Sequence, residues 1–155
     1  MSSTPWLTVI TVVKDATADF ARTSASLAAQ DLTSVEYIVI DSSDDRIGIP
    51  GVLAGIPALA STSVTWVEPA GIYAAMNAGL AMARGEYVYF ANAGDVLFSS
   101  ETLARVQEVL TTAEPSGTGA AWAFGPVEIL SQDGTRVITP RWNCLLYTSP
   151  SPRDS

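Results

Sequence analysis

The sequence contains no histidine and only one cysteine. The lack of histidine excludes histidine general bases, triads that depend on histidine and histidine-rich zinc sites. Cys144 has no second cysteine with which to form a disulfide inside the chain, so a cytosolic thiol is the expected state of this residue. The chemistry of the chain must therefore come from other residue types.

Basic residues are also scarce, since 8 lysines and arginines stand against 16 aspartates and glutamates and give a net charge of −8. No basic stripe is visible along the sequence, so we expect no nucleic-acid partner. The acidic balance does not exclude an anionic ligand. A bound pyrophosphate would need a metal ion or backbone N–H groups in place of a cage of lysines and arginines.

Long apolar runs are missing as well. The longest, around residues 87–91, is far shorter than a membrane-spanning helix requires. The first residues contain neither a basic cluster nor an apolar core of signal-peptide length. We therefore expect a cytoplasmic protein, and peripheral association with a membrane surface stays open.

The 155 residues suit one domain, and a hydrophobic content of 48% is enough to form a core. Residues 144–155 differ from the rest because their end is rich in serine and proline and follows no helical or strand period. This segment resembles a translated adapter sequence, and a natural flexible tail is the alternative. We therefore assign the domain to residues 1–143, treat 144–155 as a non-native tail and expect the natural protein to continue beyond Asn143.

Apolar, β-branched runs predict the strands of a sheet. They lie at residues 6–13, 36–41, 64–67 and 86–91, with a further strand at 122–130 and a turn at 132–134 that leads into 136–138. Helical patterns separate most of these strands. The alternation predicts right-handed βαβ units and hence an α/β fold with a mostly parallel, Rossmann-like sheet flanked by helices.

Two helix starts are marked by capping residues. Asp15 or Thr17 can cap a helix that runs to about residue 30, and Ser99 or Ser100 can cap a helix that runs to about residue 110. The region 46–62 contains two prolines and three glycines among aliphatic residues, and we expect no more than a short helix there.

Gly71 opens the helical pattern that follows the third strand. Ile72, Met76 and Leu80 recur at helical spacing, which predicts that Met76 belongs to the core. Gly85 is expected to stop this helix before the fourth strand begins.

Acidic and amide residues follow three of the predicted strands. Asp15 comes after the first, Asp41 and the loop 42–45 after the second, and Asn92 with Asp95 after the fourth. In an open α/β sheet, ligands bind at the carboxyl ends of the strands, where these loops converge. The pattern therefore favours one shared ligand site over a set of unrelated capping and solubilising residues.

The loop Asn92-Ala-Gly-Asp95 is the candidate metal site. Mg²⁺ or Mn²⁺ binds carboxylate oxygen, keeps several waters and completes its shell with substrate phosphates. Asp95 on a tight glycine-containing loop could hold such an ion against a diphosphate. The alternative is a plain turn in which Asp95 is solvated or caps a helix.

Three segments resemble the family-2-like glycosyltransferases, in particular bacterial members that build surface polysaccharides. They are residues 9–15 (VITVVKD), residues 36–41 (EYIVID) and residues 71–95, which contain GIYAAMNAG and ARGEYVYFANAGD. The resemblance covers nearly all of residues 6–110, and the last segment is the most specific. It implies a GT-A fold, here incomplete, and a nucleoside-diphosphate sugar donor with a divalent metal. It also implies inverting transfer to a saccharide or lipid-linked acceptor.

The resemblance assigns roles to residues by position. Asp95 matches the final aspartate of the family's DxD-type motif and would contact the metal, Mg²⁺ or Mn²⁺, and the diphosphate. Asp41 would hydrogen-bond the base or ribose, and the backbone after Thr11 would line the same pocket. The complete set of expected nucleotide-binding residues is Thr11, Asp15, Asp41, Ser43, Tyr73, Asn77 and Asn92.

The sequence also departs from the family pattern. The family usually reads EPD-x-GIYDAMN, whereas the segment 68–71 is one residue shorter and lacks that aspartate, and Ala74 stands where an aspartate is common. The family's catalytic base is an acceptor-side carboxylate that matches nothing here, so the catalytic residue is unknown and we expect no sugar transfer by this chain. A non-catalytic nucleotide-binding module and a nucleotidyltransferase-like α/β enzyme remain the alternatives.

Overall fold

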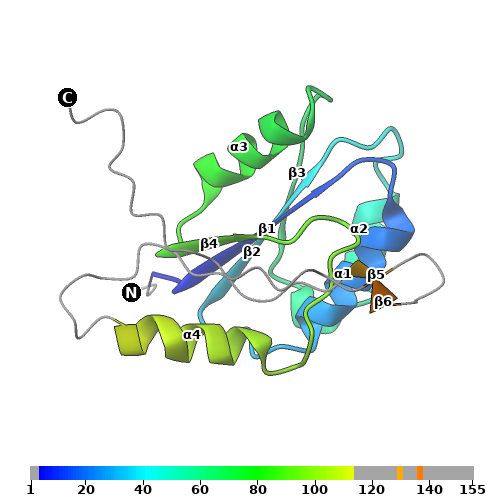
Figure 1. Ribbon diagram of the computed structural model, residues 1–155. Helices are drawn as coiled ribbons and strands as arrows, with labels where there is room; N and C mark the ends of the chain where they lie inside the picture. Colours follow the sequence, from blue (N-terminus) through cyan, green and yellow to red (C-terminus); the bar gives the residue numbers. More distant parts are fainter. Residues whose placement is uncertain (1–3, 114–128, 131–135, 138–155) are drawn as a thin grey trace, which may run out of the picture. The chain divides into compact units, whose positions relative to one another are not determined.

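The computed structural model describes residues 4–113, 129–130 and 136–137, which belong to two compact units, 1–122 and 123–155. The first unit alternates strands and helices along the chain (Figure 1). Its elements are β1 (Leu7–Val13), α1 (Thr17–Ala28), β2 (Val35–Asp41), α2 (Gly48–Ala54), the 3₁₀ turn η1 (Pro57–Leu59), β3 (Ser63–Trp66), α3 (Ile72–Met82), β4 (Tyr87–Phe90) and α4 (Thr102–Ala113).

The four strands form one parallel sheet in the order β3-β2-β1-β4. Leu7 of β1 pairs with Val35 of β2 on one side and with Tyr87 of β4 on the other, and β3 joins the outer side of β2. The prediction of a parallel sheet from four strands is therefore confirmed, with strand limits within one or two residues of those expected. The chain order reverses across β1, because β2 and β3 lie on one side of it and β4 on the other.

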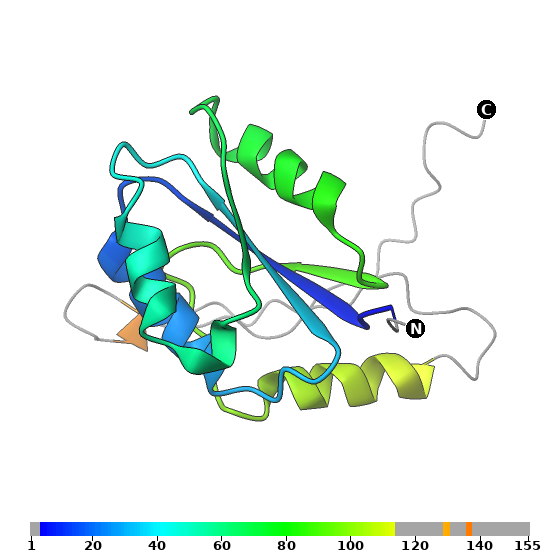
Figure 2. The same ribbon diagram turned by 180° about the vertical axis from the view of Figure 1, so that it is seen from behind.

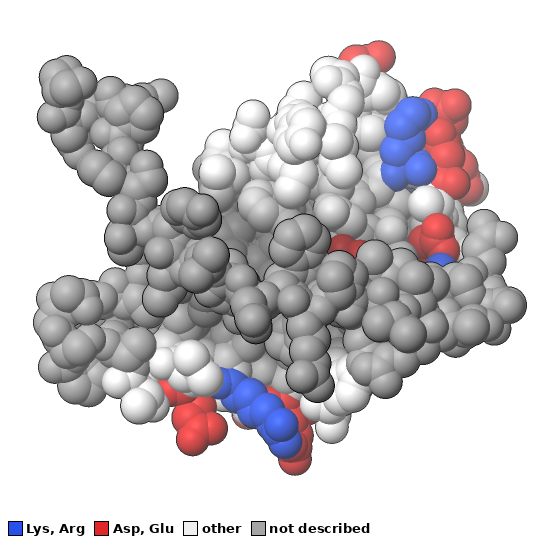
Figure 3. All heavy atoms as spheres, viewed as in Figure 1, with Lys and Arg blue, Asp and Glu red and all other residues white. Residues whose placement is uncertain are grey.

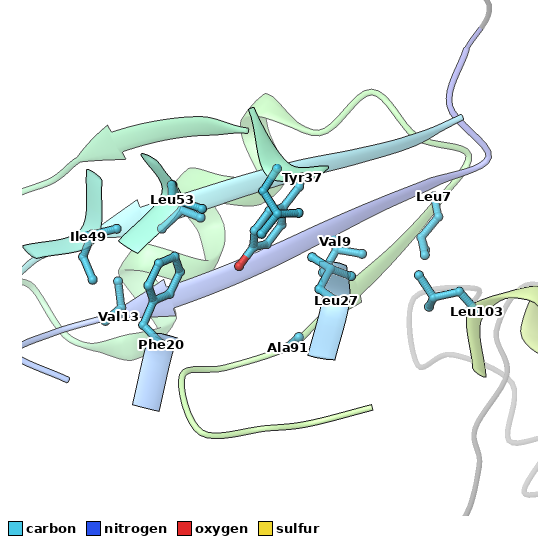
Figure 4. Packing of buried hydrophobic residues seen from close by; sticks show 12 residues of the cluster. Leu7, Val9, Val13, Phe20, Leu27, Tyr37, Ile49, Leu53, Ala91 and Leu103 are labelled. Carbon is cyan, nitrogen blue, oxygen red and sulfur yellow. The ribbon is translucent and has the colours of Figure 1, made fainter. Parts of the chain in front are cut away.

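One face of the sheet is covered by α1 and α2, and Leu103 of α4 packs on the same face (Figures 1, 2 and 4). All seven residues of β1 are buried, so alternate side chains enter the cores on both faces. On this face Val9 and Val13 meet Phe20 and Leu27 of α1. This larger core fixes α1 beneath the loops that follow β1 and β4.

The opposite face is covered by α3 alone among the described helices (Figure 2). The prediction that Ile72, Met76 and Leu80 form the inward face of this helix was wrong in part. Met76 is half-buried, but Ile72 and Leu80 are 52% and 48% exposed. The buried residues are Ala75 and Gly79. The reason is close packing, since a Cβ atom at Gly79 would lie 2.6 Å from Cγ2 of Ile10. Small residues bring the helix down onto the sheet and turn the larger ones outward.

The helix limits correct two further expectations. Neither Asp15 nor Thr17 caps α1, because Ala16 occupies the N-cap position without a side-chain cap bond. Helix α3 ends at Met82 because Ala83 is already extended, so Gly85 does not stop it. At the start of α4 the Ser99 hydroxyl accepts a hydrogen bond from the N–H of Glu101 at 3.3 Å, in agreement with its predicted place at the helix start.

In the second unit, β5 (Ile129–Leu130) and β6 (Arg136–Val137) form an antiparallel pair in which Ile129 faces Val137. The strand predicted over 122–130 is thus observed at its last two residues, and the strand predicted over 136–138 at its first two. Residues 122–128, the turn 132–134 and the segment 144–155 lie outside the described residues. Within the described part of the chain, no helix is long and apolar enough to cross a membrane.

Candidate functional site

The candidate site lies at the carboxyl edge of the sheet. Because all four strands are parallel, the residues that follow β1, β2 and β4 emerge at this one edge. Asp15, Asp41 and Asp95 are therefore brought to a common side of the molecule, as their positions after strands predicted. The edge includes the point beside β1 where the chain order reverses, which is where open α/β sheets bind ligands.

Asp15 and Ser43 join the loops after β1 and β2. The N–H of Asp15 donates to Ser43 Oγ at 2.9 Å, and the N–H of Asp44 donates to Asp15 Oδ1 at 2.9 Å. Lys14 Nζ donates to the other Asp15 oxygen at 2.8 Å, and these bonds lower the pKa of the Asp15 carboxyl. Both side chains are thus engaged within the protein, and they fix the shape of the edge.

Asp41 is the buried carboxylate of the site, with 2% of its surface exposed. Its Oδ1 accepts the N–H of Ser43 at 2.8 Å. Thr11 lies deeper in β1 and is fully buried, and its hydroxyl accepts a hydrogen bond from the Tyr37 hydroxyl at 3.0 Å. The side chain of Thr11 therefore faces the core, away from any ligand at the edge.

A pocket of about 260 Å³ opens between the ends of β1 and β2 and the first turn of α3. Its lining residues are Val12, Val13, Lys14, Ser42, Pro69, Gly71, Ile72 and Ala75. Tyr73 is 78% exposed and Asn77 is also exposed, and neither lines the pocket. None of the residues expected to bind the nucleotide lines this pocket. Its walls could not be predicted, because only the approach of α3 to the sheet turns β1 and α3 residues into opposite walls.

Trp66 and Arg46 form a second feature that sequence reasoning missed. The Trp66 indole N–H donates to the carbonyl oxygen of Ser43 at 3.1 Å, and the Arg46 guanidinium lies 3.8 Å from the centroid of its ring. Other basic side chains lie beside acidic ones, as the face in Figure 3 shows, and Lys14 with Asp15 and Arg105 with Glu101 are such pairs. Lys14, which lines the pocket, is thus already paired with Asp15.

The loop after β4 is a closed turn. The N–H of Asp95 donates to the Asn92 carbonyl oxygen at 2.9 Å, and the N–H of Asn92 donates back to Asp95 Oδ2 at 3.0 Å. Gly94 supplies the positive φ of 105° that this turn requires. Burial, and then the charge of Asp95, raise the pKa of Tyr89 on the preceding strand. Asp95 is exposed, while Asn92 Oδ1 is buried and has no hydrogen-bond partner among the described atoms.

A divalent metal fits this loop only as part of a complex with substrate. Within residues 4–113 and the two short strands, no three histidine, cysteine or acidic side chains gather into a metal site. Mg²⁺ or Mn²⁺ commonly binds through one or two carboxylates and takes its other ligands from water and substrate phosphates. Asp95, with one oxygen committed to Asn92, matches that single-carboxylate arrangement.

Comparison with known proteins identifies the class. Residues 8–142 match the family Glycosyl transferase family 2, and the chain belongs to this family. An uncharacterized glycosyltransferase of Mycobacterium tuberculosis is 31% identical over 141 residues, which are 88% of this chain and 51% of that protein. A PGL/p-HBAD biosynthesis glycosyltransferase of the same organism is 33% identical over 94 residues, covering 59% of this chain and 36% of that protein.

Solved structures agree with the fold. S. aureus TarS 1-349 in complex with UDP-GlcNAc superposes with a TM-score of 0.61 and 25% identity, covering 68% of this chain and 31% of that one. A mannosyltransferase from Pyrobaculum calidifontis in complex with GDP-Man and Mn²⁺ shares the fold, with a TM-score of 0.57, 24% identity and coverage of 70% and 33%. The predicted GT-A-like fold is confirmed. The chain spans between a third and about half of the length of the curated relatives it matches.

Proposed function

We propose that residues 1–143 are the donor-binding part of an inverting, metal-dependent glycosyltransferase that acts in polysaccharide biosynthesis in the cytoplasm. The observation that carries this proposal is the carboxyl edge of the sheet. There the buried Asp41 ends β2, the exposed Asp95 follows β4, and a pocket opens at the ends of β1 and β2. Membership of glycosyl transferase family 2 supports it.

The nucleoside occupies the pocket between β1, β2 and α3. A volume of about 260 Å³ is close to the lower limit for small-molecule pockets, so it suits one part of a nucleotide sugar. Asp41 does not line the pocket itself but precedes the lining residue Ser42, and its Oδ1 is committed to Ser43. Its other oxygen is proposed to accept a hydrogen bond from the base or ribose beside the pocket. The likeness to TarS, which was solved with UDP-GlcNAc, supports a nucleoside-diphosphate sugar as donor.

The diphosphate lies towards the loop after β4. Asp95 would hold Mg²⁺ or Mn²⁺ there, with Asn92 closing the turn through its N–H. When bound, the metal neutralises charge on the diphosphate leaving group as the bond between sugar and phosphate breaks. Asp15 and Ser43 contribute by fixing the loops on which Asp41 and the pocket wall are placed. Tyr73 and Asn77, both exposed on α3, are proposed to contact the donor from outside the pocket.

The acceptor is proposed to be a saccharide or a lipid-linked saccharide. We propose that its binding site and the general base correspond to the part of the relatives that this chain does not span. A positioned base contributes about 10²–10⁴ in rate, and in-line positioning of the acceptor contributes more. We therefore expect the 155-residue chain to bind donor without transferring sugar to candidate acceptors. Robust product formation from a panel of nucleotide sugars would show that the base has been misplaced.

Calorimetry tests the donor site directly. UDP, UDP-GlcNAc and GDP-mannose are titrated into the chain with Mn²⁺, with Mg²⁺ and with chelator, and we expect metal to strengthen binding of at least one of them. Asp95→Asn should remove the metal-dependent gain, about 100-fold, because partners one shell further out already cost 10–100-fold. Asp31→Asn is the matched control, since Asp31 is an exposed aspartate whose Oδ1 accepts a backbone N–H from Thr33. Equal binding with and without metal would count against the role given to Asp95.

A further inference from the structure

Helix α1 carries a stripe of polar side chains that faces the connection between β4 and α4. Thr23 and Ser26 lie on one side of the helix, and Gln30 follows them just beyond its end. The spacings of three and four positions place all three side chains on the same side. Thr23 and Gln30 are buried, with 1% and 8% of their surfaces exposed. Buried polar side chains on a core-facing side of a helix need partners, and here the partners lie about 70 residues further along the chain.

The stripe holds the connection at successive points. The N–H of Gly94 donates to Thr23 Oγ1 at 2.9 Å, and the N–H of Leu97 donates to Ser26 Oγ at 3.3 Å. Gln30 Nε2 donates to the Ser99 carbonyl oxygen at 2.7 Å, and Gln30 Oε1 accepts the N–H of Leu103 at 3.1 Å. Successive residues of the segment from Gly94 to Leu103 are therefore hydrogen-bonded to successive residues along α1 and its C-terminal end.

Thr23 occupies the point nearest the candidate metal carboxylate. Its hydroxyl accepts from Gly94, the residue before Asp95, and lies 3.3 Å from the Asn92 carbonyl oxygen, to which it can donate. The same hydroxyl lies 3.2 Å from the Asp19 carbonyl oxygen one helical turn earlier, and its single proton serves one of these two acceptors at a time. Thr23 thus contacts both arms of the turn that Asp95 closes.

We propose that Thr23 is a positioning residue that holds the Asp95 carboxylate in place for the metal and diphosphate, with Ser26 as a weaker second support. The proposal rests on the donor site proposed above. Gly94 and Leu97 flank Asp95, and α1 side chains accept the N–H groups of both. Without the Thr23 hydroxyl, the turn loses its link to α1, and the bond between the Asp95 carboxylate and the Asn92 N–H loses its fixed geometry.

The first test needs no ligand. Amide hydrogen exchange, followed by NMR on the chain alone, is compared for Thr23→Val, Thr23→Ser and the matched control Thr111→Val, whose hydroxyl bonds only to the Gln107 carbonyl of its own helix in the described structure. We expect Thr23→Val to lower protection of the Asn92 amide about tenfold, with the Leu103 amide unchanged. Thr23→Ser, which keeps the hydroxyl, and Thr111→Val should leave both amides as in the parent chain. Unchanged Asn92 exchange in Thr23→Val would overturn the proposal.

The second test separates positioning from general stability. Nucleotide affinity is measured by calorimetry with Mn²⁺ and with chelator, and Thr23→Val should lose about tenfold of the gain from Mn²⁺, at the lower end of the effect of outer-shell residues. Its affinity in chelator should stay unchanged, and Thr23→Ser should restore the gain. A parallel fall in both affinities would show a merely structural role. Absence of any Mn²⁺ gain in the parent chain would instead refute the proposed metal site, and the exchange experiment would still decide the positioning of Asp95.

If Thr23→Val does not fold, Ser26→Ala carries the test. Ser26 is half-buried, and its replacement removes the 3.3 Å bond from the Leu97 N–H and the 2.8 Å bond that its hydroxyl donates to the Thr23 carbonyl oxygen within α1. We expect lower protection of the Leu97 amide and a loss of about threefold in the Mn²⁺ gain, again with the affinity in chelator unchanged. A Ser26→Ala chain that keeps both the full Mn²⁺ gain and the parent protection of the Leu97 amide would overturn the role given to α1 in placing Asp95.

Discussion

The two ends of β2 carry carboxylates in different surroundings. At the amino end, Glu36 accepts hydrogen bonds from Thr8 Oγ1 at 2.7 Å, from the N–H of Arg84 at 2.9 Å and from Arg84 Nε at 2.7 Å. At the carboxyl end, Asp41 accepts one, from the N–H of Ser43. The Glu36 side chain is nearly fully bonded within the protein, whereas Asp41 keeps acceptor capacity on a buried side chain.

The backbone is also packed tightly around Glu36 and more openly beyond Asp41. At the amino end, the N–H of Gly85 donates to Thr8 Oγ1 at 2.8 Å, and a Cβ atom at Gly85 would lie 2.4 Å from the Thr8 nitrogen. At the carboxyl end, a pocket separates β1 and β2 from α3. The comparison teaches that Glu36, with its nearly complete bonding, is structural, whereas Asp41 keeps an oxygen to which a ligand can bond.

Gly85→Ala should give the largest effect, because backbone atoms of β1 leave no room for a methyl group. Overpacking costs about 1–3 kcal/mol and occasionally more, and we expect at least about 3 kcal/mol here because the obstructing atoms are backbone. Urea denaturation followed by tryptophan fluorescence measures it. Gly51→Ala is the matched control: Gly51 lies in α2 with nothing within 4 Å of a built Cβ, so it should stabilise by about 0.5–1 kcal/mol. Similar midpoints for the two variants would contradict the tight amino end.

Glu36→Gln should cost about 2 kcal/mol of stability at pH 7, since bonds to a charged group contribute about 1.5–3 kcal/mol. Burial acts to raise the pKa of Glu36, but the bonds from Thr8 and Arg84 outweigh it and hold the pKa below its usual 4.5. A lowered folded-state pKa stabilises the protein above the unfolded value and loses this effect as pH falls through the folded value. The difference between the variant and the parent should therefore shrink as the pH falls below the ordinary glutamate pKa of 4.5.

Nucleotide affinity is the second readout for Glu36→Gln. It should stay unchanged at neutral pH, because Glu36 lies at the end of β2 opposite the pocket. A loss of affinity that matched the loss of stability would break the division between the two ends of the sheet.

Asp41→Asn should give the smallest change in stability and the complementary change in binding. Asparagine keeps an oxygen for the Ser43 N–H, so we expect a cost of about 1 kcal/mol or less in urea denaturation. Nucleotide affinity should fall about tenfold, with metal and in chelator alike, because the variant loses the proposed acceptor for the base or ribose. A variant that is strongly destabilised and still binds nucleotide normally would place Asp41 with Glu36 among the structural carboxylates.

The strands and the carboxyl edge could be predicted from the sequence because they depend on local patterns. β-branched runs such as residues 7–13 favour a buried parallel strand, and the acidic residues after the strands share an edge in any parallel sheet. The helix–sheet fit was not predictable, since Gly79 rather than the larger apolar residues of α3 faces Ile10.

Polar contacts between residues far apart in the sequence could not be predicted either. Glu36 meets Arg84 across 48 positions, and Thr23 meets Gly94 across 71, so no short motif signals either contact. The pocket wall depends on the same kind of information, because Ser42 and Gly71 become neighbours only when α3 crosses the sheet. The edge that carries the candidate site was therefore predictable from the sequence, and the long-range contacts and pocket walls were not.

The strand order carries a consequence for synthesis on the ribosome. β1 is translated first, yet its second neighbour, β4, begins 80 residues later, as the pairing of Leu7 with Tyr87 shows. At about 5–20 residues per second, that interval lasts roughly 4–16 s. Throughout it, one side of an apolar seven-residue strand has unpaired N–H and C=O groups. The nascent chain therefore exposes an unpaired strand edge early in synthesis. A chaperone or a neighbouring nascent chain has several seconds in which to bind this edge.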